Sequence, residues 1–136
     1  MTDHAIAREN MIESQVRPNG ITDHRIIAAM SGLARENFVP ESRQSIAYVD
    51  EDIELAPGRY LIEAMAFAKM LQLAEIKAGD RVLHVGAASG YGSAVLSELA
   101  VSVVALECDS ALAGQCRANT DSCGNVTVAV AEISEE

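Results

Sequence analysis

The segment 81–107 constrains the fold of this chain more than any other part of the sequence. A short apolar run, 81–85, ends at a small-residue turn that contains Gly86 and Gly90. A helix-like segment follows, and a second apolar run then ends at Glu107. Glycines let the backbone turn sharply near a ligand, and a helix N-terminus offers free N–H groups. A carboxylate at a strand end can accept two hydrogen bonds from a ribose diol. This order of features therefore predicts a site of the nucleotide-binding kind.

The spacing of the turn residues separates the possible nucleotides. A dinucleotide fingerprint, G-x-G-x-x-G, read from Gly86 would place its second and third glycines at Ala88 and Tyr91, so it is disfavoured. A phosphate-binding loop that ends in Gly-Lys is excluded because no lysine follows Lys77. The spacing G-x-G-x-G matches at Gly86 and at Gly90. That pattern resembles the loop of S-adenosylmethionine-dependent methyltransferases, whose ligand carries no phosphate.

The C-terminal half of the chain alternates between two kinds of periodicity. Strands are predicted at 81–85, 101–106 and 126–131, with helices at 91–99 and 110–120 between them. Such alternation predicts a parallel sheet with right-handed crossovers. The runs are rich in valine and continuously apolar, which is typical of strands that are covered on both faces.

The N-terminal part, 3–76, is expected to be mainly helical. The first expected helix covers 4–16 with Asp3 as N-cap, and the second covers about 23–31 with Thr22 or Asp23 as N-cap. The third covers about 61–73. It is apolar on most sides, so we expect it to be largely buried, with Met65 and Met70 in the protein core. Pro40 is expected to start a short helix, 47–55 to be irregular or extended, and 56–58 to form a turn. We divide the chain into a helical subdomain with a substrate loop, 1–76, and the first half of an α/β domain, 77–136.

Composition narrows the function. The net charge is −10, and an acidic surface repels phosphate backbones, so nucleic acid is not expected as a partner. The three cysteines form no C-x-x-C pair, which argues against a disulfide framework and a zinc site and fits the cytoplasm. The N-terminus lacks the features of a signal peptide, and the most apolar segment contains Glu63 and Lys69, so no membrane span is predicted.

Motifs far apart in the chain carry a family resemblance. The stretches 10–23, 35–41 and 47–50 are similar to the opening of the protein-L-isoaspartate O-methyltransferases, and the loop at Gly86 and the acid Glu107 follow at the expected distances. The resemblance covers about residues 8–131 and implies a Rossmann-like methyltransferase fold with an S-adenosylmethionine cleft above the strand ends. The family repairs aged proteins by methylating the abnormal isoaspartyl carboxylate.

The resemblance implies a set of cofactor-binding positions, which in this sequence are Gly86, Ala87, Ala88, Ser89, Gly90, Tyr91, Glu107, Cys108 and Glu132. For two of these positions, and for His84 in the first strand, a plainer interpretation is also given. Cys108 by default is a buried structural thiol, Glu132 can be a solvated charge in an acidic tail, and His84 is expected to be an interior histidine rather than a metal ligand.

The substrate loop departs from the family pattern. Where the family reads Gly-Gln, Thr, Ile, Ser, with hydroxyls that contact the substrate carboxylate, this chain has Arg59, Tyr60 and Ile62. Ile62 has no polar atom. Arg59 could replace the lost donors with a charged fork, for which nearby Glu63 would compete. We assign no catalytic acid or base, because an ionised carboxylate needs none.

Two functional hypotheses follow. The first is S-adenosylmethionine-dependent methyl transfer to an isoaspartyl carboxylate, with very low activity because of the substrate loop. The second is a catalytically silent relative that binds the cofactor or a protein partner. Because the chain ends soon after the third predicted strand, we expect association through the uncovered sheet edge or through the N-terminal helices, most simply as a homodimer.

Overall fold

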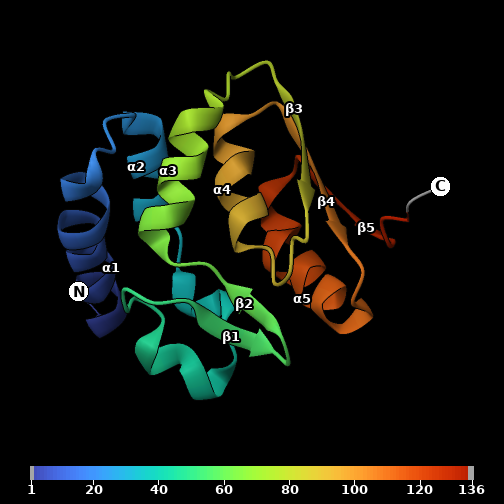
Figure 1. The fold of residues 1–136 in the computed structure, drawn as a ribbon, viewed down its shortest axis with the longest axis horizontal. Helices are drawn as coiled ribbons and strands as arrows, with labels where there is room; N and C mark the ends of the chain where they lie inside the picture. Colours follow the sequence, from blue (N-terminus) through green and yellow to red (C-terminus); the bar gives the residue numbers. More distant parts are fainter. Residues whose placement is uncertain (1, 135–136) are drawn as a thin grey trace.

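The structure is a computed structural model that describes residues 2–134 (Figure 1). Three layers follow one another across the molecule: the N-terminal helices, then helices α3 and α4, then a parallel sheet. A two-stranded hairpin lies beside the ends of the sheet strands (Figure 1). Every helix within residues 2–134 is too short or too polar to span a bilayer.

The N-terminal layer begins with α1 (Asp3–Met11), which continues as one π-helical turn (Ile12–Val16), and is followed by α2 (His24–Ser31). Asp23 caps α2 as predicted, accepting a hydrogen bond from the backbone of Arg25. The prediction of Asp3 as the cap of α1 is wrong, since the Thr2 hydroxyl accepts from the N–H of Ala5 and Asp3 already lies in the helix. A hydroxyl at the N-cap satisfies one of the free N–H groups of the first turn. Short 3-10 turns follow at Arg17–Asn19, Arg35–Phe38 and Glu41–Ile46.

The hairpin was not foreseen. Strands β1 (Ile53–Ala56) and β2 (Arg59–Leu61) pair antiparallel across the predicted turn, where Gly58 has a φ of 72°. The third helix, α3, therefore begins at Ala64 and runs to Ala74 instead of starting at residue 61. A positive φ at Gly58 lets the chain reverse, which draws the next three residues into a strand.

Helix α3 is less buried than its apolar composition suggested. Phe67 and Leu71 are buried, but Met70 is 52% exposed and Leu73 is 84% exposed. The prediction that Met70 belongs to the core is wrong. One face of α3 packs against the rest of the molecule, and apolar residues on the opposite face remain in contact with water.

The sheet has the strand order β3-β4-β5, and all strands are parallel. Its elements are β3 (Arg81–Val85), α4 (Tyr91–Leu99), β4 (Ser102–Glu107), α5 (Ser110–Thr120), a 3-10 turn (Asp121–Cys123) and β5 (Val126–Val130). These bounds agree with the predicted alternation to within one residue. Parallel neighbours place their carboxyl ends at the same edge of the sheet, so the loop after β3 lies beside the end of β4.

The helices cover one face of this sheet. Both α4 and α5 lie on the same side of the sheet (Figure 1). Val103 and Ala105 are buried, and they belong to core clusters that also contain residues of α4 and α5. On the other face, Leu83 is 60%, Val85 50% and Val104 40% exposed. The prediction that the strands are covered on both faces is therefore wrong for the described residues. We call Leu83, Val85 and Val104 the outer sheet face.

One continuous hydrophobic core joins the N-terminal helices to the sheet. It contains Met30 from α2, Phe67 from α3, Tyr91 and Val95 from α4, and Val103 from β4. The Phe38 and Tyr91 rings meet edge to face, 5.4 Å apart. This shared core holds the hairpin and the glycine loop in a fixed relation to each other.

Candidate cofactor site

The loop between β3 and α4 is shaped by left-handed backbone. The φ angles are 70° at Gly86, 52° at Ala88 and 98° at Gly90. The N–H groups of Gly86 and Ala87 both donate to the carbonyl of Leu106, at 2.9 and 3.0 Å. The φ angle of Ala88 lies in the left-handed region that glycine prefers. The loop therefore has the same backbone shape that a glycine at this position would allow.

The two loop glycines have different roles. A Cβ added at Gly90 would lie 3.0 Å from the Sγ and 3.2 Å from the Cα of Cys116, so Gly90 is needed for packing against α5. A Cβ at Gly86 would meet only the Arg59 guanidinium, at 4.0 Å. Gly86 is thus the glycine whose open side is available to a ligand.

Glu107 ends β4 with its side chain fully buried. Its Oε1 accepts from the N–H of Ala88 at 2.7 Å, and its Oε2 accepts from the N–H of Asp109 at 2.8 Å. The Arg59 guanidinium completes the set, with Nη1 donating to Oε2 at 2.8 Å and Nη2 to Oε1 at 2.5 Å. The carboxylate is therefore held by two backbone amides and a bidentate ion pair.

This arrangement shifts both ionisable groups toward their charged forms. The hydrogen bonds from Arg59 are the main reason that the pKa of Glu107 falls to about 2. The same contact raises the pKa of Arg59. Glu107 is consequently an ionised hydrogen-bond acceptor at neutral pH.

Arg59 reaches Glu107 because β2 lies across the carboxyl ends of the sheet strands, 48 residues away in sequence. The expectation that Glu63 would compete for Arg59 is wrong. The acid that holds Arg59 is Glu107, and the backbone of Glu63 instead donates to Asp52. The sequence signal was an arginine directly after the Pro57–Gly58 turn, but its partner depends on where the hairpin packs.

A cavity of about 230 Å³ lies between the glycine loop and the segment 60–62. His84 lines it from β3, and its Nδ1 is hydrogen-bonded to the Ser93 hydroxyl at 2.8 Å. Burial lowers the pKa of His84, so its imidazole is neutral at pH 7. Within residues 2–134, no His, Cys, Asp and Glu side chains gather in a group of three or more suited to a metal ion.

The chain matches one protein family along nearly its whole length. Residues 7–133 match the family model described as protein-L-isoaspartate (D-aspartate) O-methyltransferase. The chain belongs to this family. The prediction made from the separate motifs is confirmed.

Curated members of the family show the same similarity. A protein-L-isoaspartate O-methyltransferase from Methanoculleus marisnigri is 39% identical over 112 residues, which are 82% of this chain and 51% of the relative. One from Koribacter versatilis is 34% identical over 137 residues, covering 99% of this chain and 62% of the relative. The chain thus spans about half the length of the curated relatives it matches.

Solved structures of the family share the fold. A protein-L-isoaspartate O-methyltransferase superposes with a TM-score of 0.80 at 24% identity, over 92% of this chain and 42% of that one. A Plasmodium falciparum protein named for the same activity, solved in complex with S-adenosyl-L-homocysteine, gives a TM-score of 0.75 at 20% identity, over 98% of this chain and 65% of that one. The predicted Rossmann-like fold with an incomplete parallel sheet is confirmed.

In this member of the family, the segment that departs from the hydroxyl pattern lies at the cavity. Ile62 is half-buried against the core and lines the cavity, together with Tyr60, which is 55% exposed. The Tyr60 hydroxyl lies 3.4 Å from Glu54 on the neighbouring strand. At the cavity, this segment therefore presents an apolar side chain at Ile62 and a Tyr60 hydroxyl that points toward β1.

Two loop positions of the predicted site serve the fold. The Ser89 hydroxyl is buried and donates to the carbonyl of Phe38 at 2.6 Å. The backbone carbonyl of Ser89 accepts a hydrogen bond from the side-chain amide of Asn119 at 2.9 Å. Tyr91 is 1% exposed, packs in the core and is one of the residues that line the cavity. Ser89 and Tyr91 therefore connect the glycine loop to the interior of the protein.

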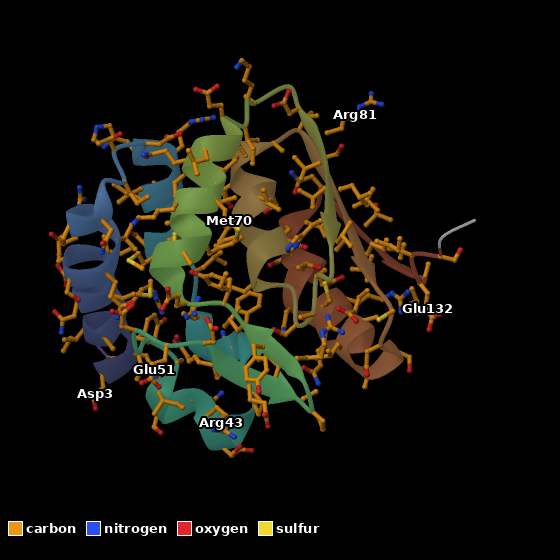
Figure 2. The ribbon with its side chains drawn as sticks, viewed as in Figure 1. Asp3, Arg43, Glu51, Met70, Arg81 and Glu132 are labelled. Carbon is orange, nitrogen blue, oxygen red and sulfur yellow. The ribbon has the colours of Figure 1, made fainter. Side chains whose placement is uncertain are left out.

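The two outlying positions of the predicted site are in contact with water. Cys108 is exposed, so the default interpretation of a buried structural thiol is wrong. Glu132 is exposed beyond the end of β5 (Figure 2). The structure thus brings together Gly86, Ala88 and Glu107.

Proposed function

We propose that this chain binds S-adenosylmethionine at the glycine loop and Glu107, and serves methyl transfer to the isoaspartyl carboxylate of damaged proteins. One observation carries the proposal: the buried carboxylate of Glu107 stands at the end of β4 beside the open side of Gly86. Family membership over residues 7–133 supports it, as does the bound S-adenosyl-L-homocysteine in the Plasmodium falciparum structure.

The residues present fit the ribose of such a cofactor. Two guanidinium nitrogens of Arg59 donate hydrogen bonds, one to each carboxylate oxygen of Glu107. Two adjacent hydroxyl groups can donate to a carboxylate in the same bidentate way. A guanidinium therefore stands where a ribose diol would donate. On this side of Gly86, the nearest group to a Cβ placed there would be the guanidinium of the same Arg59.

Bound S-adenosylmethionine supplies a methyl group activated by its sulfonium. The protein's contribution is then mainly positioning, which brings the acceptor oxygen in line with the methyl carbon. We place the acceptor in the cavity between the loop and the segment 60–62. A carboxylate acceptor is already ionised at neutral pH, so we assign no residue as general base.

The second candidate function is a catalytically silent relative that binds the cofactor or a protein partner. Ile62 favours it, because an aliphatic side chain at the cavity cannot donate a hydrogen bond to a substrate carboxylate. Tyr60 does not replace the donor, since its hydroxyl donates to the carboxylate of Glu54 at 3.4 Å.

We further propose that the chain works in the cytoplasm on protein or peptide substrates, does not bind nucleic acid, and forms a homodimer. The net charge of −10 supports the exclusion of nucleic acid. The exposed apolar residues of the outer sheet face support self-association.

Two measurements test the function. Calorimetry should show binding of S-adenosyl-L-homocysteine and much weaker binding of NAD; the reverse order would overturn the cofactor assignment. Transfer of labelled methyl groups to an isoaspartyl peptide, with the matched aspartyl peptide as control, separates the two candidates. Cofactor binding without any transfer favours the silent relative.

A further inference from the structure

The acid proposed to hold the ribose is already saturated. An ionised carboxylate offers about four acceptor positions. In Glu107, the N–H groups of Ala88 and Asp109 take one on each oxygen, and the fork of Arg59 takes the others. A ribose diol needs two acceptor positions, so a ligand hydroxyl pair has to displace one set of donors.

Of these donors, only Arg59 can leave. The amides of Ala88 and Asp109 belong to the loop after β3 and to the turn after β4, which the sheet and α5 hold in place. The Arg59 side chain is 29% exposed and comes from a three-residue strand of a hairpin. Within residues 2–134, its side chain makes hydrogen bonds to Glu107 and to no other residue.

We propose that Arg59 sets the affinity for the cofactor by competing with its ribose for the carboxylate of Glu107. This inference rests on the proposed function. Binding exchanges a charged guanidinium for two neutral hydroxyls, so the ion pair is broken and the guanidinium moves into solvent. The affinity of the wild-type chain is therefore lower than its loop and acid alone would provide.

Two consequences distinguish this role from a structural one. Removing Arg59 tightens cofactor binding while it lowers the stability of the free protein, because the buried Glu107 loses its counter-charge. A merely structural contact would weaken both. In addition, salt weakens a partly exposed ion pair, so the wild-type affinity rises with ionic strength.

The test is calorimetry with S-adenosyl-L-homocysteine on the wild type, Arg59→Gln, Arg59→Lys and the control Arg43→Gln. Arg43 is an exposed arginine on the 3-10 turn Glu41–Ile46, before the hairpin (Figure 2). We expect Arg59→Gln to bind about tenfold or more tightly than wild type. Arg59→Lys should lie between them, because an ammonium cannot form the bidentate fork. Arg43→Gln should match the wild type.

The salt dependence gives a readout that needs no variant. Between about 50 mM and about 500 mM NaCl, wild-type affinity should rise and Arg59→Gln affinity should stay flat. If Arg59→Gln fails to fold by circular dichroism, Arg59→Lys and the salt series decide. Wild-type affinity that stays flat or falls with salt, together with equal binding by Arg59→Lys, overturns the competition.

The outcomes separate this inference from the proposed function. Equal or weaker binding by Arg59→Gln overturns the competition and leaves the cofactor assignment standing. If neither the wild type nor Arg59→Gln binds S-adenosyl-L-homocysteine at either salt concentration, both fall. Tighter binding by Arg59→Gln with lowered stability in urea supports both.

Discussion

The guanidinium of Arg35 lies 4.8 Å from the centre of the Tyr91 ring. Arg35 is fully buried, and it donates to the carbonyls of Ala47 at 2.7 Å and Ile62 at 3.0 Å. One charged side chain thus ties the segment before the hairpin and the segment after it to the helix that follows the glycine loop. We therefore expect Arg35, together with the shared core, to hold the hairpin in its position near Glu107.

Replacing Arg35 should therefore destabilise the fold. Arg35→Leu leaves the carbonyls of Ala47 and Ile62 without their donor and removes the cation above Tyr91. We expect a loss of about 3 kcal/mol in the free energy of unfolding in urea. Arg43→Leu, at an exposed position, should change it by less than about 0.5 kcal/mol. A small effect of Arg35→Leu would mean that the hairpin is held by other contacts.

The stability of the chain should depend on the ionisation of Glu107. Its pKa in the folded protein is about 2, below the ordinary 4.5. The charged form is the stabilised one, so its contribution is complete above about pH 4.5 and is lost as the pH falls toward about 2. Linkage gives this contribution a size of about 3 kcal/mol. Urea unfolding should show wild type more stable than Glu107→Gln at pH 7, with a much smaller gap at pH 3.

The control for this pH effect is Glu98→Gln. Glu98 is exposed on α4, so its substitution should leave the gap to wild type near zero at both pH values. A gap for Glu107→Gln that is the same at pH 3 as at pH 7 would contradict the ion pair as its source.

Removing the acid should weaken cofactor binding. Glu107→Ala takes away both acceptors that we assign to the ribose, which should cost about 2–3 kcal/mol of binding free energy for S-adenosyl-L-homocysteine. Calorimetry with Glu98→Ala as the matched acid should give the wild-type value. Equal binding by Glu107→Ala and wild type would remove Glu107 from the site.

Methyl transfer to an isoaspartyl peptide should be very low. Ile62 at the cavity and Tyr60 beside Glu54 leave a substrate carboxylate without neutral hydroxyl donors. The double variant Tyr60→Thr, Ile62→Ser restores both donors and should raise the rate, measured with labelled S-adenosylmethionine. Robust turnover by the wild type would show that this segment is not disabling.

The outer sheet face should mediate self-association. Light scattering at micromolar concentration is expected to give the mass of a dimer for the wild type and of a monomer for Leu83→Lys, because a buried lysine is costly at an apolar contact. Leu73→Lys, at an 84% exposed position on α3, is the control and should remain a dimer. A wild-type chain that is monomeric and melts cooperatively would refute the dimer.

Much of the α/β half could be predicted because its signals are local. The bounds of β3, α4 and α5 follow from hydrophobic periodicity and from small residues at the turns, and the structure has them at Arg81–Val85, Tyr91–Leu99 and Ser110–Thr120. A cap is also local, yet Thr2 and Asp3 are both acceptable caps, and the sequence alone favoured the wrong one.

In the candidate site, too, some features could be predicted from local sequence and others could not. The loop at Gly86 and the acid Glu107 were predicted from their spacing, since parallel strands bring consecutive carboxyl ends to one edge. The exposure of Met70 and of Val104 was not predicted, because composition shows that a residue is apolar but not whether another element covers it.

The sequence by itself thus determined the order of strands, loop and helices in the α/β half, the family, and the acid at the end of β4. Only the tertiary structure decided which cation that acid holds. Arg59 and Glu107 are 48 residues apart, and their contact exists because the shared core packs the hairpin across the strand ends. Glu63 is only four residues from Arg59 and was the nearer partner in sequence. Nearness along the chain does not decide which side chains meet, because the direction of each side chain is set by how its strand packs against the rest of the protein.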